Sequence, residues 1–260
     1  MPRFFIPAEG RPLDDGETVR VTGSDAVHIR RSLRMREGDT LFLCDGAGTD
    51  YFSELTGFDG EAVLFRILYH TPTALEPDTA VTLYQGLPKG EKMEWIVQKA
   101  VELGVSEIVP VVTARSIVRL KPGEGEKKRE RWQRIAAEAA GQCGRGRIPR
   151  VATPLSFAEA VKRLAGESAL VFYEGGGQPL GELIGLDCRT LSIVVGPEGG
   201  FEKEEVDRLL QNGARAATLG KRILRCETAP LAALAVLMHL TGNLYFLLLQ
   251  LTISTVRFSH

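Results

Sequence analysis

From residue 78 onward, the sequence alternates short apolar runs with segments whose apolar residues recur at helical spacing. Strands are predicted at residues 81–87, 107–112, 169–173, 191–195 and 216–219. Between the first two, helical spacing separates the apolar residues Met93, Ile96, Val97, Ala100 and Leu103. Alternating strands and helices allow successive strands to run parallel with helices covering both faces of the sheet. The pattern therefore predicts an α/β domain with a mostly parallel sheet.

The first 70 residues follow a different pattern, in which short β-rich runs are separated by glycine and aspartate turns. These runs lie at residues 3–6, 40–44, 51–56 and 62–69. Asp59-Gly60 precedes the last run and supplies the positive φ values that a tight hairpin needs. We therefore divide the chain into a small β-barrel at 1–70, a proline-containing linker at 71–77, the α/β domain at 78–243 and an apolar tail at 244–260.

Composition narrows the class of protein. The 260 residues include 32 basic and 33 acidic side chains and are 44% hydrophobic, which is ordinary globular composition and excludes disordered and fibrous proteins. The four cysteines form no C-x-x-C pair and only four histidines accompany them, so neither a disulfide framework nor a metal site is predicted. The charged, proline-containing N-terminus lacks the apolar core of a signal peptide, and a reduced, cytoplasmic protein is expected.

One segment is apolar enough to cross a bilayer on hydropathy alone. From residue 228 to 256, only His239 has a side chain that can be charged near neutral pH. Thr241-Gly242-Asn243 interrupts this run, the part before it is rich in alanine, and no basic cluster at its start sets an orientation. We expect a buried helix followed by the apolar tail, and no membrane span.

Positive charge is concentrated in two places in this nearly neutral chain. Residues 1–70 hold 8 arginines against 12 acidic residues, yet Arg30, Arg31, Arg34 and Arg36 fall within seven positions. Residues 115–150 hold 11 basic against 4 acidic residues. Such clusters bind polyanions because phosphate contacts release condensed counterions, and arginine adds bidentate geometry. The basic run at 127–131 taken alone is typical of a solvated helix face, but two clusters in two domains favour an RNA partner.

Two turns in the α/β region are candidate ligand sites. Residues 194–201, VVGPEGGF, follow a predicted strand and precede a helix predicted to begin near Glu202. The glycines permit close approach to the backbone, and a helix N-terminus offers free N–H donors. The motif is neither G-x-G-x-x-G nor a phosphate loop, and Glu198 would repel phosphate, so a neutral or cationic small ligand is favoured. Residues 218–229 again join a strand to a helix, with Thr228 as its expected N-cap.

Four strings occur in the chain in this order: HIRRSLRMREGD, GLPKGEKMEWIVQKAVELGVSEIVP, VGPEGGF and LGKRILRCETAPLAAL. Together they resemble the RsmE family of 16S ribosomal RNA uridine-N3 methyltransferases, which belong to the SPOUT class, and the resemblance covers essentially the whole chain. It implies a PUA-like RNA-binding barrel followed by an α/β methyltransferase domain whose C-terminal segment forms a trefoil knot, a rare exception to ordinary chain topology. It also implies S-adenosylmethionine as cofactor and a homodimer with active sites at or near the subunit interface.

The resemblance further implies roles for particular residues. One wall of the cofactor pocket is expected from Gly196, Glu198, Gly199 and Gly200. Another wall is expected from Leu219, Gly220, Ile223, Leu224 and Arg225, with backbone groups reading the adenine edge. Further candidates for this pocket are Val171, Phe172 and Tyr173. The expected RNA contacts are Arg3, Arg30, Arg31, Arg34 and Arg36 in the first domain and Lys89, Lys92 and Arg145 in the second, with a structural role as the alternative for Arg36.

The chain departs from the family pattern in two places. The family commonly has glutamate where this sequence has Gly141, ahead of Gln142, Cys143, Gly144 and Arg145. Any function of that glutamate is therefore absent or supplied elsewhere. The apolar tail from Leu244 to His260 extends past the usual end of the family.

The expected reaction is methylation of N3 of a specific uridine in the 16S ribosomal RNA of the small subunit. N3 becomes a good nucleophile only as its imide proton leaves, so the site needs a proton acceptor and a group that stabilises the developing anion. Arg225 is the expected stabiliser or uridine-positioning group, because guanidinium is always charged and offers several donors. Glu198 is a candidate base, and alternatively holds the cofactor or backbone donors.

Three other functions are consistent with parts of the sequence. A related SPOUT enzyme would methylate the ribose 2′-oxygen, and the identity of the modified nucleoside separates the two reactions. A non-catalytic ribosome-assembly factor would bind RNA without methyl transfer. A nicotinamide-dependent oxidoreductase is the general α/β alternative, and the absence of G-x-G-x-x-G counts against it.

Overall fold

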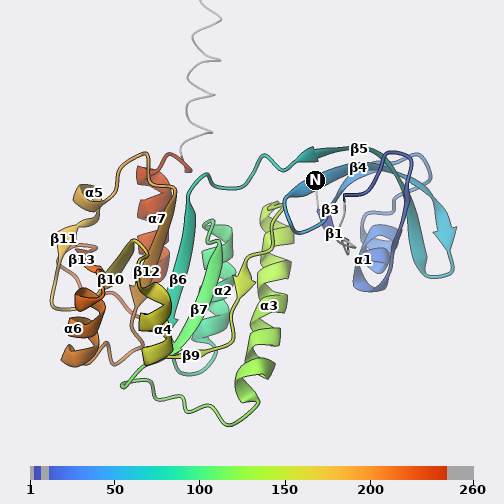
Figure 1. The fold of residues 1–260 in the computed structure, drawn as a ribbon. Helices are drawn as coiled ribbons and strands as arrows, with labels where there is room; N and C mark the ends of the chain where they lie inside the picture. Colours follow the sequence, from blue (N-terminus) through green and yellow to red (C-terminus); the bar gives the residue numbers. More distant parts are fainter. Residues whose placement is uncertain (1–2, 7–11, 245–260) are drawn as a thin grey trace, which may run out of the picture. The chain divides into compact units, whose positions relative to one another are not determined.

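The computed structural model describes residues 3–6 and 12–244, and these fall into two compact units (Figure 1). One unit comprises Met1–Glu76 with Ala137–Ile148, and the other comprises Pro77–Ala136 with Pro149–His260. The first unit thus includes a segment, 137–148, that the sequence assigned to the α/β domain. The first two residues of the predicted linker belong to a strand, β5 (Ala62–Pro72). The predicted tail lies outside the described residues apart from Leu244.

The first unit is built on a five-stranded sheet. Its strand order is β1 (Phe4–Phe5), β3 (Thr40–Cys44), β4 (Thr49–Asp59), β5 and β2 (Thr18–Val21). The predicted hairpin is confirmed, because Asp59 pairs with Ala62 and Gly60 has a φ of 58°. The core residues lie on the side of the sheet that packs against Ala26 and Ile29.

The sequence did not predict the segment that carries the arginine cluster as helical. Its first part forms a short helix, α1 (Gly23–Val27), followed by one π-helical turn, η1 (His28–Ser32), and Arg34 and Arg36 lie after this turn. Neither helical element is long enough to give a periodic apolar pattern, and each contributes one buried residue, Ala26 or Ile29, to the core. Packing on the sheet, rather than local propensity, is what holds this segment in a helical conformation.

The second unit contains a parallel sheet. Its strands are β6 (Ala80–Gly86), β7 (Glu107–Val112), β8 (Arg150–Val151), β9 (Leu155–Ser156), β10 (Ala169–Phe172), β11 (Gln178–Pro179), β12 (Thr190–Val195) and β13 (Arg215–Thr218). Their order is β11-β13-β10-β12-β6-β7-β8, with β9 also pairing with β7, and every pairing is parallel. The five strands predicted from the sequence are confirmed to within one residue at each end.

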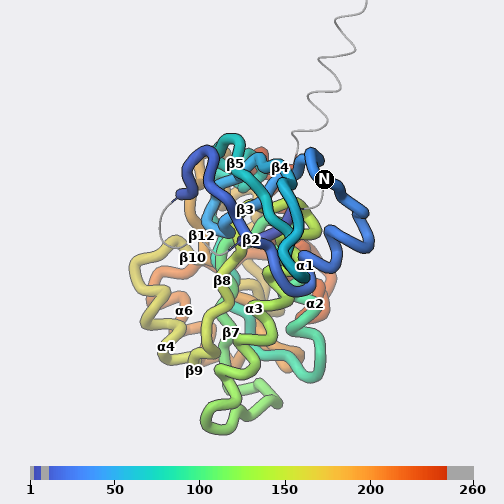
Figure 2. Tube along the Cα trace, turned by 90° about the vertical axis from the view of Figure 1, so that its right-hand side faces the viewer, coloured from blue at the N-terminus to red at the C-terminus, as the bar shows by residue number. Residues whose placement is uncertain are grey.

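Helices cover both faces of this sheet, as the alternating pattern predicted. The helices of this unit are α2 (Lys92–Glu102), α4 (Phe157–Leu164), α5 (Leu180–Leu183), α6 (Lys203–Gln211), α7 (Ala229–Leu240) and the part of α3 (Glu124–Cys143) before residue 137. Helices α4 and α6 lie on one face, and α2 and α7 pack together on the other (Figures 1 and 2). Glu202 is the N-cap of α6 and forms a capping box with Glu205, so the helix begins where it was predicted.

The apolar segment before the tail is the helix α7, which packs against α2, β6 and β12. Its buried residues include Ala233, Leu234 and Leu237, which confirms the predicted buried helix. Thr228 occupies the N-cap position, but its side chain makes no capping hydrogen bond, so the expected side-chain cap is wrong. Over residues 3–6 and 12–244, the structure contains no helix with both the length and the apolar character needed to cross a membrane.

Candidate functional site

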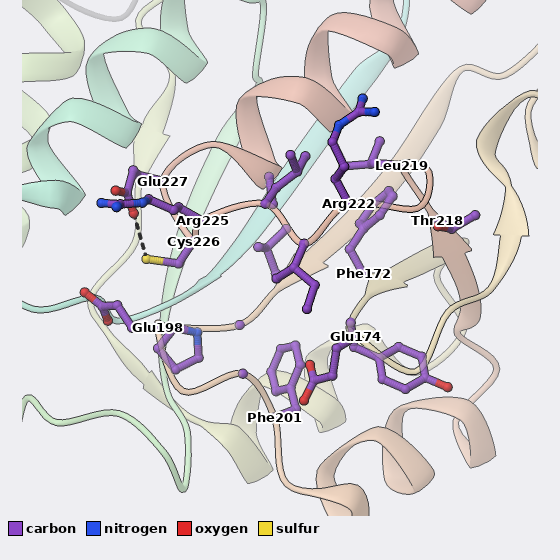
Figure 3. Close-up of a pocket in the computed structure, with 18 of the residues that line it drawn as sticks. Phe172, Glu174, Glu198, Phe201, Thr218, Leu219, Arg222, Arg225, Cys226 and Glu227 are labelled. Carbon is purple, nitrogen blue, oxygen red and sulfur yellow. Dashed lines mark hydrogen bonds between the residues drawn. The ribbon is translucent and has the colours of Figure 1, made fainter.

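A cavity of about 650 Å³ lies at the carboxyl ends of neighbouring parallel strands in the second unit (Figure 3). Phe172, Val195 and Thr218 end the adjacent strands β10, β12 and β13, and all three line the cavity. Because parallel strands all end at the same edge of a sheet, the loops that follow them meet there, which is where open α/β folds bind ligands. The two turns singled out in the sequence supply the cavity's two main walls.

The first wall is the turn that follows β12, residues 196–201. The N–H of Gly200 donates to the carbonyl of Pro197 at 3.0 Å, and Gly200 has a φ of 67°, which favours glycine. The turn also lies against the end of β6, where a Cβ on Gly86 would come within 2.6 Å of the Pro197 nitrogen. Phe201 is buried in the core beside Phe157, and this anchors the end of the turn.

The second wall is the loop that follows β13, residues 219–225. It brings the apolar side chains of Leu219, Ile223 and Leu224 to the cavity, and Ile223 is 88% exposed. In the part of the chain that the structure describes, the backbone N–H groups of residues 221–225 have no hydrogen-bond partner. Apolar side chains beside unpaired N–H donors suit a flat heteroaromatic ligand, whose faces pack on carbon and whose edge accepts hydrogen bonds.

A lysine joins the two walls through two carboxylates. Lys92 Nζ donates to Glu198 Oε1 at 2.9 Å and lies 3.4 Å from Glu227 Oε2, while the backbone N–H of Lys89 donates to Glu198 at 3.1 Å. Burial acts to raise the pKa of Glu198, but the hydrogen bonds from Lys92 and from backbone N–H groups outweigh it and hold this pKa below its usual value. Glu198 is therefore a weak proton acceptor, and its geometry is that of a link between α2 and the glycine turn.

Cys226 lies next to this lysine but is not poised for nucleophilic chemistry. Burial, the hydrogen bond to Glu227 and the negative charges of Glu198 and Glu227 raise the pKa of its thiol to about 12. The neutral thiol donates to Glu227 Oε2 at 3.1 Å (Figure 3). Because the thiolate is the reactive form, Cys226 acts as a hydrogen-bond donor here.

Most of the predicted cofactor residues come together at this cavity. The residues that line it as predicted are Phe172, Tyr173, Gly196, Glu198, Gly199, Gly200, Leu219, Gly220, Ile223, Leu224 and Arg225. Val171 does not, because its side chain is fully buried in the core among residues of α4 and α6. Strand alternation explains the difference, since neighbouring side chains on β10 point to opposite faces of the sheet.

Other residues that line the cavity were not predicted from the sequence. Phe201 adjoins the glycine turn and Glu227 adjoins Arg225, so both lay within the motifs already identified. Glu174 lies two residues after the end of β10 and belongs to none of the motifs identified in the sequence, so nothing local indicated that it lines the cavity. Lys92 was predicted to contact RNA, yet it lines the cavity and is paired with Glu198.

The predicted RNA contacts fall into two groups, those that are at least partly exposed and those that are buried against carboxylates. Arg31, Arg34 and Arg36 are exposed, and Arg34 adopts a φ of 54°, which is unusual for a residue with a side chain. Arg30 is partly buried, with its guanidinium 4.6 Å from the centre of the Phe58 ring. Lys89 is exposed and contributes its backbone N–H to Glu198.

Two of the predicted RNA contacts, Arg3 and Arg145, have guanidinium groups that are hydrogen-bonded to carboxylates inside the first unit. Arg145 is 5% exposed, and its Nη2 and Nε donate to Glu76 at 2.7 and 3.2 Å. Arg3 Nη1 donates to the buried Asp50 at 2.5 Å. A guanidinium that is largely buried against a carboxylate is less accessible to a phosphate than an exposed one, so Arg31, Arg34 and Arg36 are better placed for RNA.

The fold and the site together define a class, the α/β RNA methyltransferases that carry a PUA domain. A family model described as an RNA methyltransferase domain matches residues 75–238, and one described as an RNA methyltransferase PUA domain matches residues 21–68. Ribosomal RNA small subunit methyltransferase E of Bacillus subtilis is 37% identical to this chain over 93% of it and 97% of the relative. The chain therefore belongs to the ribosomal RNA small subunit methyltransferase E family, within the SPOUT fold class.

Solved structures agree with this assignment. A ribosomal RNA small subunit methyltransferase E from Neisseria gonorrhoeae, bound to S-adenosyl methionine, is 36% identical and has a TM-score of 0.82, covering 92% of this chain and 98% of that one. A putative methyltransferase from Legionella pneumophila, in complex with the bound cofactor SAM, is 30% identical with a TM-score of 0.80, covering 91% of this chain and 96% of that one.

Proposed function

We propose that this protein transfers a methyl group from S-adenosylmethionine to N3 of a specific uridine in 16S ribosomal RNA. The observation that carries the proposal is the cavity formed by the 196–201 turn and the 219–225 loop at the strand ends. The comparisons with known proteins also support the proposal, because the chain belongs to a methyltransferase family and two solved structures of the same fold contain bound S-adenosylmethionine. N3-uridine specificity is the activity of this family.

The lining of the cavity fits S-adenosylmethionine. The unpaired N–H groups of residues 221–225 and the side chains of Phe172, Leu219 and Leu224 match the edge and faces of an adenine ring. The carboxylates of Glu174 and Glu227 also line the cavity, alongside the basic side chains of Lys92, Lys221, Arg222 and Arg225, so the lining offers charges of both signs to a ligand that carries an ammonium and a carboxylate. When bound, S-adenosylmethionine supplies an electrophilic methyl group on a positively charged sulfur.

Arg225 is the residue that we assign to the uridine. Its side chain lies on the same side of the cavity as Glu227 and Glu198, whereas that of Arg222 points away (Figure 3). A guanidinium beside the uracil ring would stabilise the negative charge that spreads onto its oxygens as the N3 proton leaves. Positioning of the two reactants supplies much of the remaining acceleration, so a strong base on the protein is not required.

Glu198 serves, on this proposal, as a link that holds the glycine turn rather than as the base. Glu198→Gln is expected to raise the KM for S-adenosylmethionine by about 3- to 10-fold and to change kcat by less than about threefold, because it weakens one charge-assisted hydrogen bond. Steady-state methyl transfer at saturating RNA measures both constants. A fall in kcat of about 100-fold, with KM unchanged, would instead make Glu198 the general base.

The arginine cluster of the first unit is proposed to bind the RNA. Arg31→Glu combined with Arg34→Glu is expected to weaken RNA binding by about 10-fold or more at moderate salt and to lower the salt dependence of binding, since fewer counterions are released. The affinity for S-adenosylmethionine should stay unchanged. Filter binding of a 16S ribosomal RNA fragment measures the effect, with the exposed Arg189→Glu as control. Unaltered RNA affinity in the double variant would remove this cluster from the interface.

The decisive experiment incubates the purified protein with labelled S-adenosylmethionine and small ribosomal subunits that lack their native methylation. Digestion of the RNA and identification of the labelled nucleoside should give N3-methyluridine. Label in a 2′-O-methylated nucleoside would establish the other SPOUT reaction. Binding of RNA and cofactor without label in any substrate would indicate an assembly factor.

We further propose that the protein acts in the cytoplasm as a homodimer on the small ribosomal subunit, and that the C-terminal segment of its methyltransferase domain threads a loop as a trefoil knot. Ile223 in the 219–225 loop is apolar and 88% exposed, which supports a second copy packing against this loop. An exposed apolar side chain in a wall of the cavity is consistent with an active site that two subunits complete. Sedimentation of the purified protein measures the oligomeric state.

A further inference from the structure

Arg115 holds the glycine turn from outside the cavity. It follows β7 and is not among the residues that line the cavity. Its Nη1 donates to the carbonyl of Gly199 at 2.9 Å, and its Nε and Nη2 donate to the two carboxylate oxygens of Glu202 at 3.0 and 3.2 Å. One side chain therefore connects the turn to the N-cap of α6.

The turn is packed tightly between Arg115 and Glu174. A Cβ on Gly199 would lie 3.0 Å from Cβ of Arg115, and a Cβ on Gly200 would lie 3.0 Å from the carboxylate of Glu174. Glu174 in turn lies 3.9 Å from Nη1 of Arg115. Because Gly199 is packed against Arg115, which does not line the cavity, a shift of Arg115 changes the room available to the turn.

The backbone that carries Arg115 is itself fixed to α6. The N–H of Ala114 donates to Glu205 Oε1 at 2.9 Å, and Glu205 is buried. The other carboxylate oxygen of Glu205 accepts from the N–H of Glu202 at 3.0 Å. The 114–115 backbone and the start of α6 thus form one connected frame, from which the guanidinium reaches the Gly199 carbonyl.

Arg115 is suited to fix geometry more than to stabilise the fold. Its side chain and that of Glu202 are 41% and 44% exposed, and exposed ion pairs contribute little to global stability. A bidentate guanidinium–carboxylate pair nevertheless fixes the orientation of the guanidinium plane. Here the pair with Glu202 orients Arg115 so that its Nη1 donates to the Gly199 carbonyl in the cavity wall. The turn's own hydrogen bond, from Gly200 to Pro197, constrains only one end of it.

We propose that Arg115 is a positioning residue for the cofactor site: it holds the Gly199–Gly200 peptide in the conformation that receives the ligand, without touching the ligand. This inference rests on the proposed function of the cavity. Nothing in the sequence motifs pointed to Arg115, because its partners Gly199 and Glu202 lie 84 and 87 residues further along the chain.

The test compares Arg115→Met with wild type by calorimetric titration of S-adenosylmethionine and by steady-state methyl transfer. Methionine keeps an unbranched stem and removes the charge and all donors. We expect Kd and KM for S-adenosylmethionine to rise by about tenfold or more, with KM for RNA unchanged and a melting temperature within a few degrees of wild type. Arg115→Lys should recover part of the affinity, since one ammonium cannot serve the carbonyl and both carboxylate oxygens.

Two matched variants complete the test. Arg119→Met removes an exposed arginine four residues away and should leave the affinity at the wild-type value. Glu202→Gln should weaken binding by itself, and combining it with Arg115→Met should add little, because both changes break the same link.

The positioning role of Arg115 and the proposed function fail on different results. If wild type binds S-adenosylmethionine and Arg115→Met binds it equally well, the positioning role is overturned while the proposed function stands. A parallel loss of cofactor affinity, RNA affinity and melting temperature, not relieved in Arg115→Lys, would also overturn it in favour of a purely structural role. If wild type itself does not bind S-adenosylmethionine, the proposed function fails.

Discussion

Arg225→Ala is expected to lower the rate of methyl transfer by about 100-fold or more while changing S-adenosylmethionine affinity by less than about threefold. Arg225 lines the cavity, is exposed, and lies with Glu227 and Glu198 on one side of it (Figure 3). Removing a donor aimed at charge that develops only in the transition state reduces kcat and leaves ground-state binding of the cofactor intact. Single-turnover transfer to small ribosomal subunits, with the cofactor affinity from calorimetry, measures both quantities.

The neighbouring Arg222 provides the matched comparison for this prediction. It belongs to the same loop and carries the same charge, but its side chain points away from Arg225 and Glu227 (Figure 3). Arg222→Ala should therefore reduce the transfer rate far less than Arg225→Ala does. Equal losses of transfer rate and cofactor affinity in Arg225→Ala would reassign Arg225 to the cofactor pocket.

The largest expected loss of stability comes from Arg145→Ala, at about 3–5 kcal/mol for the first unit. The side chains of Arg145 and Glu76 are only 6% and 15% exposed, and Glu76 also accepts from the N–H groups of Gly146 and Arg147 at 3.1 and 3.0 Å. Alanine leaves the carboxylate buried without its counter-charge, which costs more than the pair itself contributes. Urea unfolding, followed by circular dichroism, should show an earlier transition.

A control distinguishes this burial effect from loss of positive charge in general. Arg150 has a side chain that is 75% exposed, and Arg150→Ala should change the free energy of unfolding by less than about 0.5 kcal/mol. The double change Arg145→Met with Glu76→Gln should cost less than Arg145→Ala, because no buried charge remains unpaired. An unfolding midpoint of Arg145→Ala equal to that of Arg150→Ala would contradict a structural role for the buried pair.

Local patterns in the sequence were sufficient to predict the architecture of the second unit. The strands β6, β7, β10 and β12 are rich in apolar residues, as burial on both faces of a parallel sheet requires, and the shorter β13 carries Ala216 and Ala217. The two cavity walls were also predictable, because a turn between a parallel strand and a helix must lie at the carboxyl edge of the sheet. Those features depend on residues close together in the chain.

The tertiary structure alone decided which charged residues serve the site. Arg31 and Arg145 look equally basic in the sequence, but only Arg145 meets a buried carboxylate, 69 residues away. Lys92 and Glu198, separated by 106 residues, form a link between α2 and the glycine turn, and Arg115 meets Glu202 across 87 residues. The physical reason is that the partner of a charged side chain, unlike the period of a strand or helix, depends on which distant segments the fold brings within hydrogen-bonding distance.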